Sequence, residues 1–218
     1  MRDASAFIRA NTALQHPPHT PEIALHLASE IVPIWRMTEE ELAREGVPPP
    51  FWAFAWAGGQ AVARYVLDHP GIVRGKRVLD FGAGSGLAGS AAMRAGAADA
   101  LAADIDPFTA AAVALNAAAN GVSLAHTSND IVGTDGGWDV ILVGDMCYER
   151  DLSARVMAWL QDLVRRGATV LIGDPGRAYL PKAGLTALAE YDVATTRELE
   201  DHAVRRTRVF RLAPPERL

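Results

Sequence analysis

Short apolar runs alternate with longer segments of helical composition from residue 76 onward. Apolar runs of about 4–8 residues between turn residues are typical of buried strands, and alanine- and leucine-rich runs of about 10 or more are typical of helices. The pattern predicts strands over 77–81, 100–104, 123–127, 138–144 and 168–173, and helices over 86–95, 106–119, 151–165 and 181–190. Such an alternation predicts a parallel sheet with helices on both faces.

The last two strand-like segments, 191–197 and 204–212, are joined by only a short polar loop. A parallel pair would need a crossover of about a dozen residues or more, so these two segments should form an antiparallel hairpin. We therefore predict an α/β fold with a seven-stranded, mostly parallel, Rossmann-like sheet. A C-terminal antiparallel hairpin completes this sheet, and helices lie on both of its faces.

The first part of the chain has a different composition, and we expect residues 1–47 to form a helical extension packed on a main domain over 48–218. Proline restricts the residue before it and lacks an N–H, so a helix over about 1–15 should end at the His16–His19 stretch. Thr20 as N-cap with Pro21 after it predicts a second helix over 21–30. A third short helix is predicted over 38–45, where acids occupy the first turn.

Four aromatic residues within positions 51–56 precede the pair Gly58-Gly59 and a helical run to Asp68. Two interpretations stay open. These side chains can act as a hydrophobic staple that fixes the start of the helix. Alternatively, they can form an aromatic wall beside a ligand, where flat rings exclude water and contact a cation.

Composition excludes several classes of function. The chain has 218 residues, a net charge of −5 and one cysteine, Cys147. We expect one domain with a short extension, a monomer in the cytoplasm, without a disulfide, a metal site, or a surface for nucleic acid or membrane. His16 and His19 lack a third ligand nearby and fit a solvated loop. Cys147 has no histidine close in sequence and fits a small buried side chain better than a nucleophile.

The most informative segment for function is a predicted strand that is followed by a glycine-rich turn. Residues Val78–Gly86 place glycines at 82, 84 and 86, and a helical run follows. Glycine accepts φ > 0 and lets backbone N–H groups approach a ligand, while the N-terminus of the next helix points at the same ligand. The segment 84–89 also satisfies the dinucleotide pattern G-x-G-x-x-G, with Asp104 as the acid for a ribose.

Asp80 helps to separate the two cofactors that such a turn can bind. A carboxylate at the end of the strand would face the pyrophosphate of a dinucleotide with like charge. S-adenosylmethionine instead brings a cationic amino group and a sulfonium. The residues favour S-adenosylmethionine, and a dinucleotide or a purely structural glycine turn remain as alternatives.

Acidic and amide side chains follow each of the first four strands of the sheet, where ligands of open α/β folds bind. They are Asp80, Asp104, Asn129-Asp130 and Asp145, and Tyr148 follows closely. Asp130 could accept a hydrogen bond from an adenine amino group, although Asp and Asn are also ordinary turn residues. Asp145 could align an acceptor amine and stabilise the positive charge that its nitrogen acquires as a methyl group is transferred. A carboxylate alone would not deprotonate that amine, so aromatic side chains would supply the desolvation.

Five segments together give a family resemblance: Phe51–Gln60, Val78–Gly86, Ala103–Pro107, Asp145–Tyr148 and Gly173–Arg177. This combination resembles the lysine methyltransferases that act on the electron transfer flavoprotein β subunit, in the form of a bacterial-type member, over about residues 48–212. The D-x-x-Y element at Asp145–Tyr148 is shared with a wider set of seven-stranded protein-lysine methyltransferases and marks the class rather than the substrate.

The resemblance implies the methyltransferase form of the predicted fold, with S-adenosylmethionine as cofactor and S-adenosylhomocysteine as product. The catalytic residues that it implies are Asp145 and Tyr148. The cofactor-binding residues that we predict are Trp56, Asp80, Gly82, Gly84, Gly86, Asp104, Ile105, Asn129, Asp130 and Asp145.

The predicted function is that of a protein-lysine N-methyltransferase that works by direct in-line transfer, without a metal or a covalent intermediate. The resemblance offers two protein substrates, the electron transfer flavoprotein β subunit and the ribosomal stalk protein L7/L12, without choosing between them. Four arginines of the last strand could dock an acidic substrate or form a charged solvent face: Arg205, Arg206, Arg208 and Arg211. The alternatives are a nicotinamide-dependent oxidoreductase, a small-molecule methyltransferase and an inactive binding module.

Overall fold

A computed structural model describes residues 3–28, 49–195 and 203–214. Its main sheet has seven strands in the order β5-β4-β3-β6-β7-β9-β8. The strands up to β7 run parallel, and β9 is antiparallel to both β7 and β8, so the predicted sheet is confirmed. Their bounds are Arg77–Phe81 (β3), Asp99–Ala103 (β4), Ala125–Thr127 (β5), Val140–Gly144 (β6), Thr169–Asp174 (β7), Leu185–Ala194 (β8) and Val204–Leu212 (β9).

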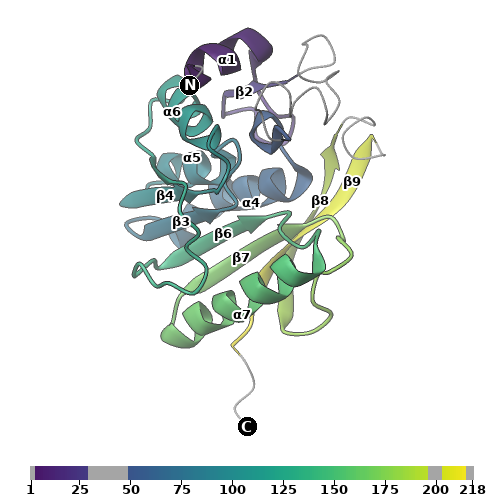
Figure 1. Cartoon of the computed structure of the whole chain (residues 1–218). Helices are drawn as coiled ribbons and strands as arrows, with labels where there is room; N and C mark the ends of the chain where they lie inside the picture. The colour runs from purple at the N-terminus through teal and green to yellow at the C-terminus, as the bar shows by residue number, and fades with distance from the viewer. Residues whose placement is uncertain (1–2, 29–48, 196–202, 215–218) are drawn as a thin grey trace.

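Helices cover both faces of this sheet (Figure 1). One face is covered by α4 (Ala57–Asp68), α5 (Leu87–Arg94) and α6 (Thr109–Ala119), and the other by α7 (Arg150–Arg166). Two short 3-10 turns, η1 (Phe51–Ala53) and η2 (Pro70–Ile72), flank α4. In the described parts of the chain, no helix combines the length and the apolar character needed to cross a membrane.

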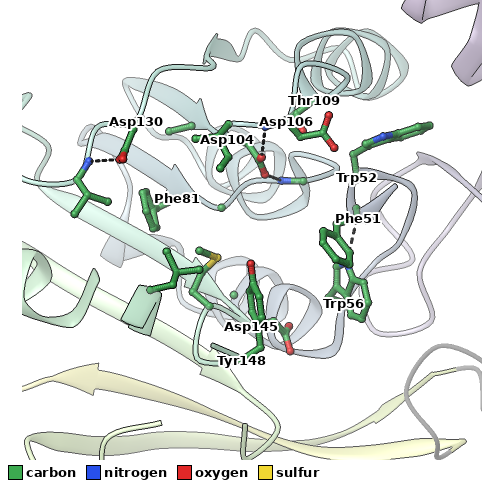
Figure 2. Close-up of a pocket in the computed structure, with 18 of the residues that line it drawn as sticks. Phe51, Trp52, Trp56, Phe81, Asp104, Asp106, Thr109, Asp130, Asp145 and Tyr148 are labelled. Carbon is green, nitrogen blue, oxygen red and sulfur yellow. Dashed lines mark hydrogen bonds between the residues drawn. The ribbon is translucent and has the colours of Figure 1, made fainter. Parts of the chain in front are cut away.

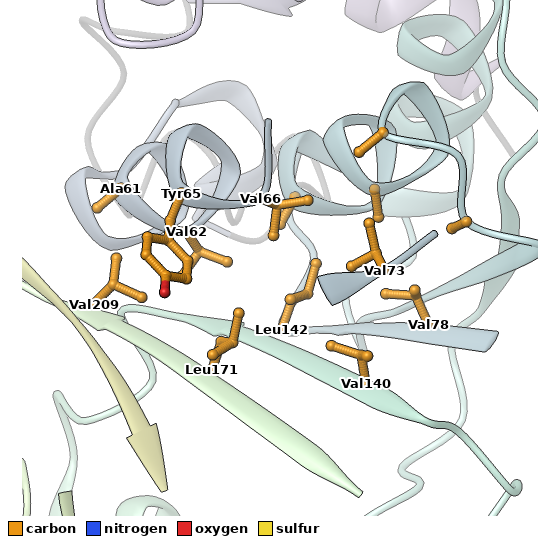
Figure 3. Close-up of a cluster of buried hydrophobic side chains, with 14 of the residues drawn as sticks. Ala61, Val62, Tyr65, Val66, Val73, Val78, Val140, Leu142, Leu171 and Val209 are labelled. Carbon is orange, nitrogen blue, oxygen red and sulfur yellow. The ribbon is translucent and has the colours of Figure 1, made fainter. Parts of the chain in front are cut away.

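Strand residues divide between two cores because successive side chains point to opposite faces of a sheet. Val78, Leu142 and Leu171 pack with α4 and its neighbours on one face (Figure 3). Leu79 and Ile141 pack under α7 on the other face. Both faces are buried, which explains why these strands are continuous apolar runs rather than alternating ones.

Two predicted helices are wrong. The segment expected as a helix over 181–190 contains most of β8, which pairs with β9 along its length, from Leu185 opposite Leu212 to Ala194 opposite Val204. Its alanines and leucines favour a helix locally, but the exposed hydrogen-bonding groups of β9 override that preference. The helix expected over 21–30 is replaced over its described residues by β2 (Leu25–Leu27), which pairs with β1 (Ala13–Gln15).

Other boundaries shift. Helix α1 covers only Ala4–Asn11 of the expected 1–15, and α6 begins at Thr109, after a turn in which Asp106 accepts a hydrogen bond from the Phe108 N–H. The short helix predicted over 38–45 lies outside the described residues. The carboxyl ends of β3, β4, β5 and β6 all open on the same edge of the sheet, which brings the predicted side chains together.

Candidate functional site

A cavity of about 560 Å³ lies at this edge, within the size range of about 300–1,000 Å³ that is usual for small-molecule sites (Figure 2). Its lining includes nine of the predicted site residues: Trp56, Gly82, Gly84, Asp104, Ile105, Asn129, Asp130, Asp145 and Tyr148. Two opposite parts of the lining have different properties. We call Trp52, Gly82, Gly84, Asp104, Asp106 and Thr109 the glycine wall, and Trp56, Asp145, Tyr148 and Arg177 the Asp145 wall.

Backbone amides organise the glycine wall. Gly82 and Gly84 have φ of +66° and +49°, in the left-handed region that favours glycine. The Gly84 N–H donates to Asp104 Oδ2 at 2.9 Å, and the Asp106 N–H donates to Asp104 Oδ1 at 3.0 Å. The Asp104 carboxylate is thereby fixed at the end of β4, in the lining of the cavity and close to the glycine turn.

Three buried polar atoms of the glycine wall have no hydrogen-bond partner in the described part of the chain. They are Trp52 Nε1, Asp106 Oδ2 and Thr109 Oγ1, and all three residues line the cavity (Figure 2). A buried polar atom without a partner costs roughly 1–3 kcal/mol, so native structures generally provide one. One donor, one acceptor and one hydroxyl that can do both fit a ligand with hydroxyl, amino and carboxylate groups, such as S-adenosylmethionine.

Burial also changes the protonation of this wall. Desolvation, together with the nearby charge of Asp104, raises the pKa of Asp106 to about 6 against the lowering effect of the Phe108 N–H. A polar ligand that hydrogen-bonds to Asp106 Oδ2 would favour the ionised form.

Asp80 and Gly86 lie outside the lining. Asp80 is 3% exposed beneath the turn, where its Oδ2 accepts a hydrogen bond of 2.7 Å from the Gly89 N–H of α5. Burial raises its pKa to about 7. Gly86 caps α5 with φ of +75°, and a Cβ there would lie 3.1 Å from Val113 Cγ2. Both residues shape the turn, and their direct contact with a cofactor stays a prediction.

Asp145 is held in an unusual backbone conformation. Its φ of +57° is the one positive value at a non-glycine residue among those the structure describes. Its N–H donates to the Gly173 carbonyl at 3.0 Å, and its Oδ2 accepts from the N–H groups of Gly58 and Gly59 at 2.5 and 3.3 Å. These N–H groups belong to the first turn of α4, where the helix dipole favours an anion.

The other carboxylate oxygen of Asp145 binds an arginine. Arg177 donates from Nε at 3.1 Å and from Nη2 at 2.7 Å to Asp145 Oδ1. The Arg177 guanidinium carbon also lies 5.8 Å from the centroid of the Trp56 ring, within the range of a cation–π contact. Arg177 follows β7 in the Gly-Asp-Pro-Gly-Arg segment, and sequence reasoning assigned it no role.

Aromatic rings stand beside this pair. The Phe51 and Trp56 ring centroids are 5.8 Å apart, and the Trp56 Nε1–H donates to the Phe51 carbonyl at 3.0 Å. Phe51 and Tyr148 are exposed in the cavity lining, whereas Trp52 is buried and stacks on Phe108. Three of the four aromatic residues, Phe51, Trp52 and Trp56, line the cavity, so the structure favours the interpretation of this stretch as an aromatic wall beside a ligand.

The rim residues Asn129, Asp130 and Ile105 are more exposed. Asp130 accepts from the Val132 N–H and pairs with Arg155 at 2.8 Å, and these two contacts lower its pKa. Ile105 is 74% exposed and offers an apolar surface at the mouth. The predicted contact of Asp130 with an adenine amino group stays a prediction.

Cys147 and the arginines of the hairpin lie outside the cavity lining. Cys147 is buried, as predicted, and burial raises the pKa of its thiol to about 12, which leaves it protonated at neutral pH. On the hairpin, Arg206 and Arg208 form exposed ion pairs with Glu190 and Asp192 of β8. These pairs favour the charged solvent face over an open docking surface.

Known proteins resemble the chain at two levels. The family model described as Ribosomal protein L11 methyltransferase (PrmA) matches residues 65–144. The electron transfer flavoprotein beta subunit lysine methyltransferase of Xenopus laevis is 38% identical over 216 residues, which covers 96% of this chain and 87% of that protein. The protein of the same description from Danio rerio is 36% identical, with coverages of 96% and 83%.

A solved structure confirms the fold class. The magnesium protoporphyrin IX methyltransferase (ChlM) of Synechocystis PCC 6803, with bound SAM, matches with a TM-score of 0.52 over 70% of this chain and 77% of that chain. The two sequences are 18% identical, so this likeness concerns the fold alone.

Proposed function

The chain belongs to the family of electron transfer flavoprotein β subunit lysine methyltransferases, and from this premise we propose that it methylates lysine side chains of that subunit. It is an S-adenosylmethionine-dependent methyltransferase, with S-adenosylhomocysteine as product. The nicotinamide alternative has no support from these relatives.

One observation carries the proposal: Asp104, Asp106 and Thr109 of the glycine wall lie across a single cavity from Trp56, Asp145 and Tyr148 of the Asp145 wall (Figure 2). Asp104, Asp106, Thr109 and the N–H groups of the glycine turn would hold the cofactor. When bound, the cofactor supplies a methyl group on a positively charged sulfur. The Asp145 wall would hold the acceptor amine on the other side.

The acceptor lysine must release a proton to the surrounding water before its nitrogen can attack the methyl group. With a reference pKa of ~10.4, freeing the neutral amine at pH 7 costs on the order of 4–5 kcal/mol. Phe51, Trp56 and Tyr148 would exclude water from the amine and so favour its neutral form. Asp145 Oδ1 would then orient the amine N–H and stabilise the charge that grows on nitrogen during transfer.

The ribosomal stalk protein L7/L12 remains a second candidate substrate from the family resemblance alone. The match to the L11 methyltransferase model ends at Gly144, directly before Asp145. That segment covers most of the glycine wall and none of the Asp145 wall, so it supports a shared cofactor site rather than a ribosomal substrate.

The test is transfer of labelled methyl from S-adenosylmethionine to purified flavoprotein β subunit and to L7/L12, with a whole-cell extract alongside. We expect label on lysines of the β subunit, located by mass spectrometry, and none with Asp145→Ala. Label confined to L7/L12 would show that L7/L12, and not the flavoprotein β subunit, is the substrate. An extract without any labelled protein would contradict protein methylation and favour a small-molecule acceptor.

A further inference from the structure

We propose that Arg177 occupies the position where the acceptor amine binds, which we call the seat, and that the substrate lysine displaces the Arg177 guanidinium from Asp145. This inference rests on the proposed function, and it makes Arg177 a determinant of which amines can be methylated. The observations behind it are the two oxygens of Asp145, the Trp56 ring and the loop that holds Arg177.

The seat has the chemistry that a lysine ammonium needs. A protonated amine in a cavity requires a carboxylate partner and gains from the face of an aromatic ring. Asp145 Oδ1 and the Trp56 ring provide both, and the Arg177 guanidinium contacts each of them: its Nη2 lies 2.7 Å from the oxygen and its central carbon 5.8 Å from the ring centroid. The protein's own cation thus sits where the substrate's cation would bind.

The two oxygens of Asp145 differ in how easily their hydrogen-bond donors could be displaced. Oδ2 is bound to backbone N–H groups of Gly58 and Gly59, which are fixed at the start of α4. Oδ1 is bound to the end of a long side chain that is 20% exposed. A rotation of that side chain would release Oδ1 while Oδ2 stays anchored, so the carboxylate would keep its position.

The loop supports a movement of the side chain alone. The N–H groups of Gly176 and Arg177 both donate to Asp174 Oδ1, at 2.7 and 2.6 Å, and Asp174 is buried at the end of β7. These bonds hold the backbone of Arg177 in place. The guanidinium can therefore leave and return without rearrangement of the strand.

The other cavity carboxylates in the described lining are poorer seats for the amine. The Asp130–Arg155 pair lies at the rim with side chains 47% and 55% exposed, so water screens its charge, whereas the side chain of Asp145 is 9% exposed. Asp104 accepts two backbone N–H groups on the glycine wall, next to Asp106. Exchange at Asp145 replaces one cation by another and leaves the charge of the site unchanged, whereas two cations on one carboxylate would repel each other.

The exchange has a consequence for specificity. A free small amine would have to compete with Arg177 using its charge alone. A lysine on a docked protein has the rest of the protein interface to offset the displacement. Arg177 would thus exclude small amines while admitting the lysine of a bound protein.

Binding of n-butylammonium chloride, a mimic of the lysine side chain, tests the seat directly. Calorimetry is done on the S-adenosylhomocysteine complexes of the wild type, Arg177→Ala and Arg177→Gln. We expect both variants to bind the amine at least about tenfold more tightly than the wild type, since neither keeps the guanidinium on Asp145 Oδ1. Equal affinity in all three proteins would overturn the proposal. This measurement needs no protein substrate, so it is independent of whether the flavoprotein subunit is the target.

Steady-state kinetics with the protein substrate identified by the labelling experiment give the second test. We expect Arg177→Ala to lower KM for the protein by roughly fivefold to tenfold and thereby to raise kcat/KM. Added guanidinium chloride should inhibit this variant competitively with the protein substrate, whereas equal sodium chloride should not. The opposite result, a fall in kcat that guanidinium restores, would make Arg177 a permanent positioning residue and overturn the proposal.

The matched control is Arg165→Ala. Arg165 is an exposed arginine of α7 that pairs with Asp162 and lies outside the cavity lining, so its loss should change neither amine binding nor KM. Thermal unfolding of each variant shows whether it is folded, and Arg177→Gln, which retains hydrogen-bond donors without the charge, provides the measurement where the alanine variant is unstable.

Discussion

The two walls of the cavity differ in how their polar atoms are satisfied. On the glycine wall, Asp106 Oδ2, Thr109 Oγ1 and Trp52 Nε1 are buried without a protein partner in the described residues. On the Asp145 wall, each oxygen of the carboxylate accepts two hydrogen bonds from the protein, whereas each oxygen of Asp104 accepts one and keeps room for a ligand. Unpaired atoms indicate a surface prepared for a ligand that completes it. A saturated carboxylate indicates one that is held in shape and can bind a ligand only by exchange.

The largest effect on stability should come from disrupting the close packing of Gly58 against Asp145 and Gly173. A Cβ at Gly58 would lie 2.2 Å from the Gly173 carbonyl oxygen and 2.5 Å from Asp145 Oδ2, so Gly58→Ala should destabilise the fold by about 3 kcal/mol or more. Gly59→Ala is the matched control, because a Cβ there meets nothing within 4 Å. Urea unfolding should show the second variant equal to the wild type or up to about 1 kcal/mol more stable. Equal losses in both would contradict the close approach.

Removal of the Asp145 charge should separate the walls functionally. Asp145→Asn keeps the shape but loses the carboxylate, so methyl transfer should fall at least about 100-fold. S-adenosylhomocysteine affinity, measured by calorimetry, should stay within about threefold because the glycine wall is intact. A parallel loss of binding would show that the two walls are not separable.

The reciprocal change is Asp104→Asn on the glycine wall. Loss of a charged acceptor fixed by two N–H groups should weaken S-adenosylhomocysteine binding by about 10- to 100-fold, since such a hydrogen bond is worth about 1.5–3 kcal/mol. At saturating cofactor, kcat should largely recover. A lasting loss of kcat with normal affinity would move Asp104 out of the cofactor site.

The smallest expected effect is a pH dependence of cofactor affinity. The pKa of Asp106, raised to about 6 by burial, means that its carboxyl becomes protonated as the pH falls through 6. A ligand that donates to Oδ2 prefers the ionised form, so affinity should be constant above pH 7 and should fall by roughly threefold to tenfold towards pH 5. Asp106→Asn should flatten this profile. An unchanged slope in the variant would assign the dependence to another group, such as Asp80.

The sheet was predictable where local pattern and tertiary context agree. Strands β3, β6 and β7 are apolar runs that are buried on both faces, and their carboxyl ends had to meet at one edge. Residues 185–190, the first part of β8, were mistaken for a helix because their composition favours one, and only pairing with β9 makes them a strand. Pairing partners that are distant in sequence or follow later in the chain leave no local signal.

For the site, too, the sequence predicted the positions that follow from topology but not the side-chain contacts. Asp104 and Asp145 follow strands, so their place in the cavity could be inferred from topology. The partners of Asp145 could not, because the contact with Gly58 depends on how α4 meets β6 and β7, and the contact with Arg177 depends on a side-chain conformation. The unpaired atom of Asp106 also depends on burial, although its spacing of two residues after Asp104 was a visible signal.

The backbone contact between Gly58 and Gly173 also sets an order of events during synthesis. The two glycines come from opposite halves of the chain, and each would place a Cβ about 2 Å from the other's carbonyl oxygen. Helix α4 leaves the ribosome long before β7 exists, and at roughly 5–20 residues per second it waits on the order of ten seconds for its final partner. The Asp145 wall is therefore among the last parts of the nascent protein to take its native form.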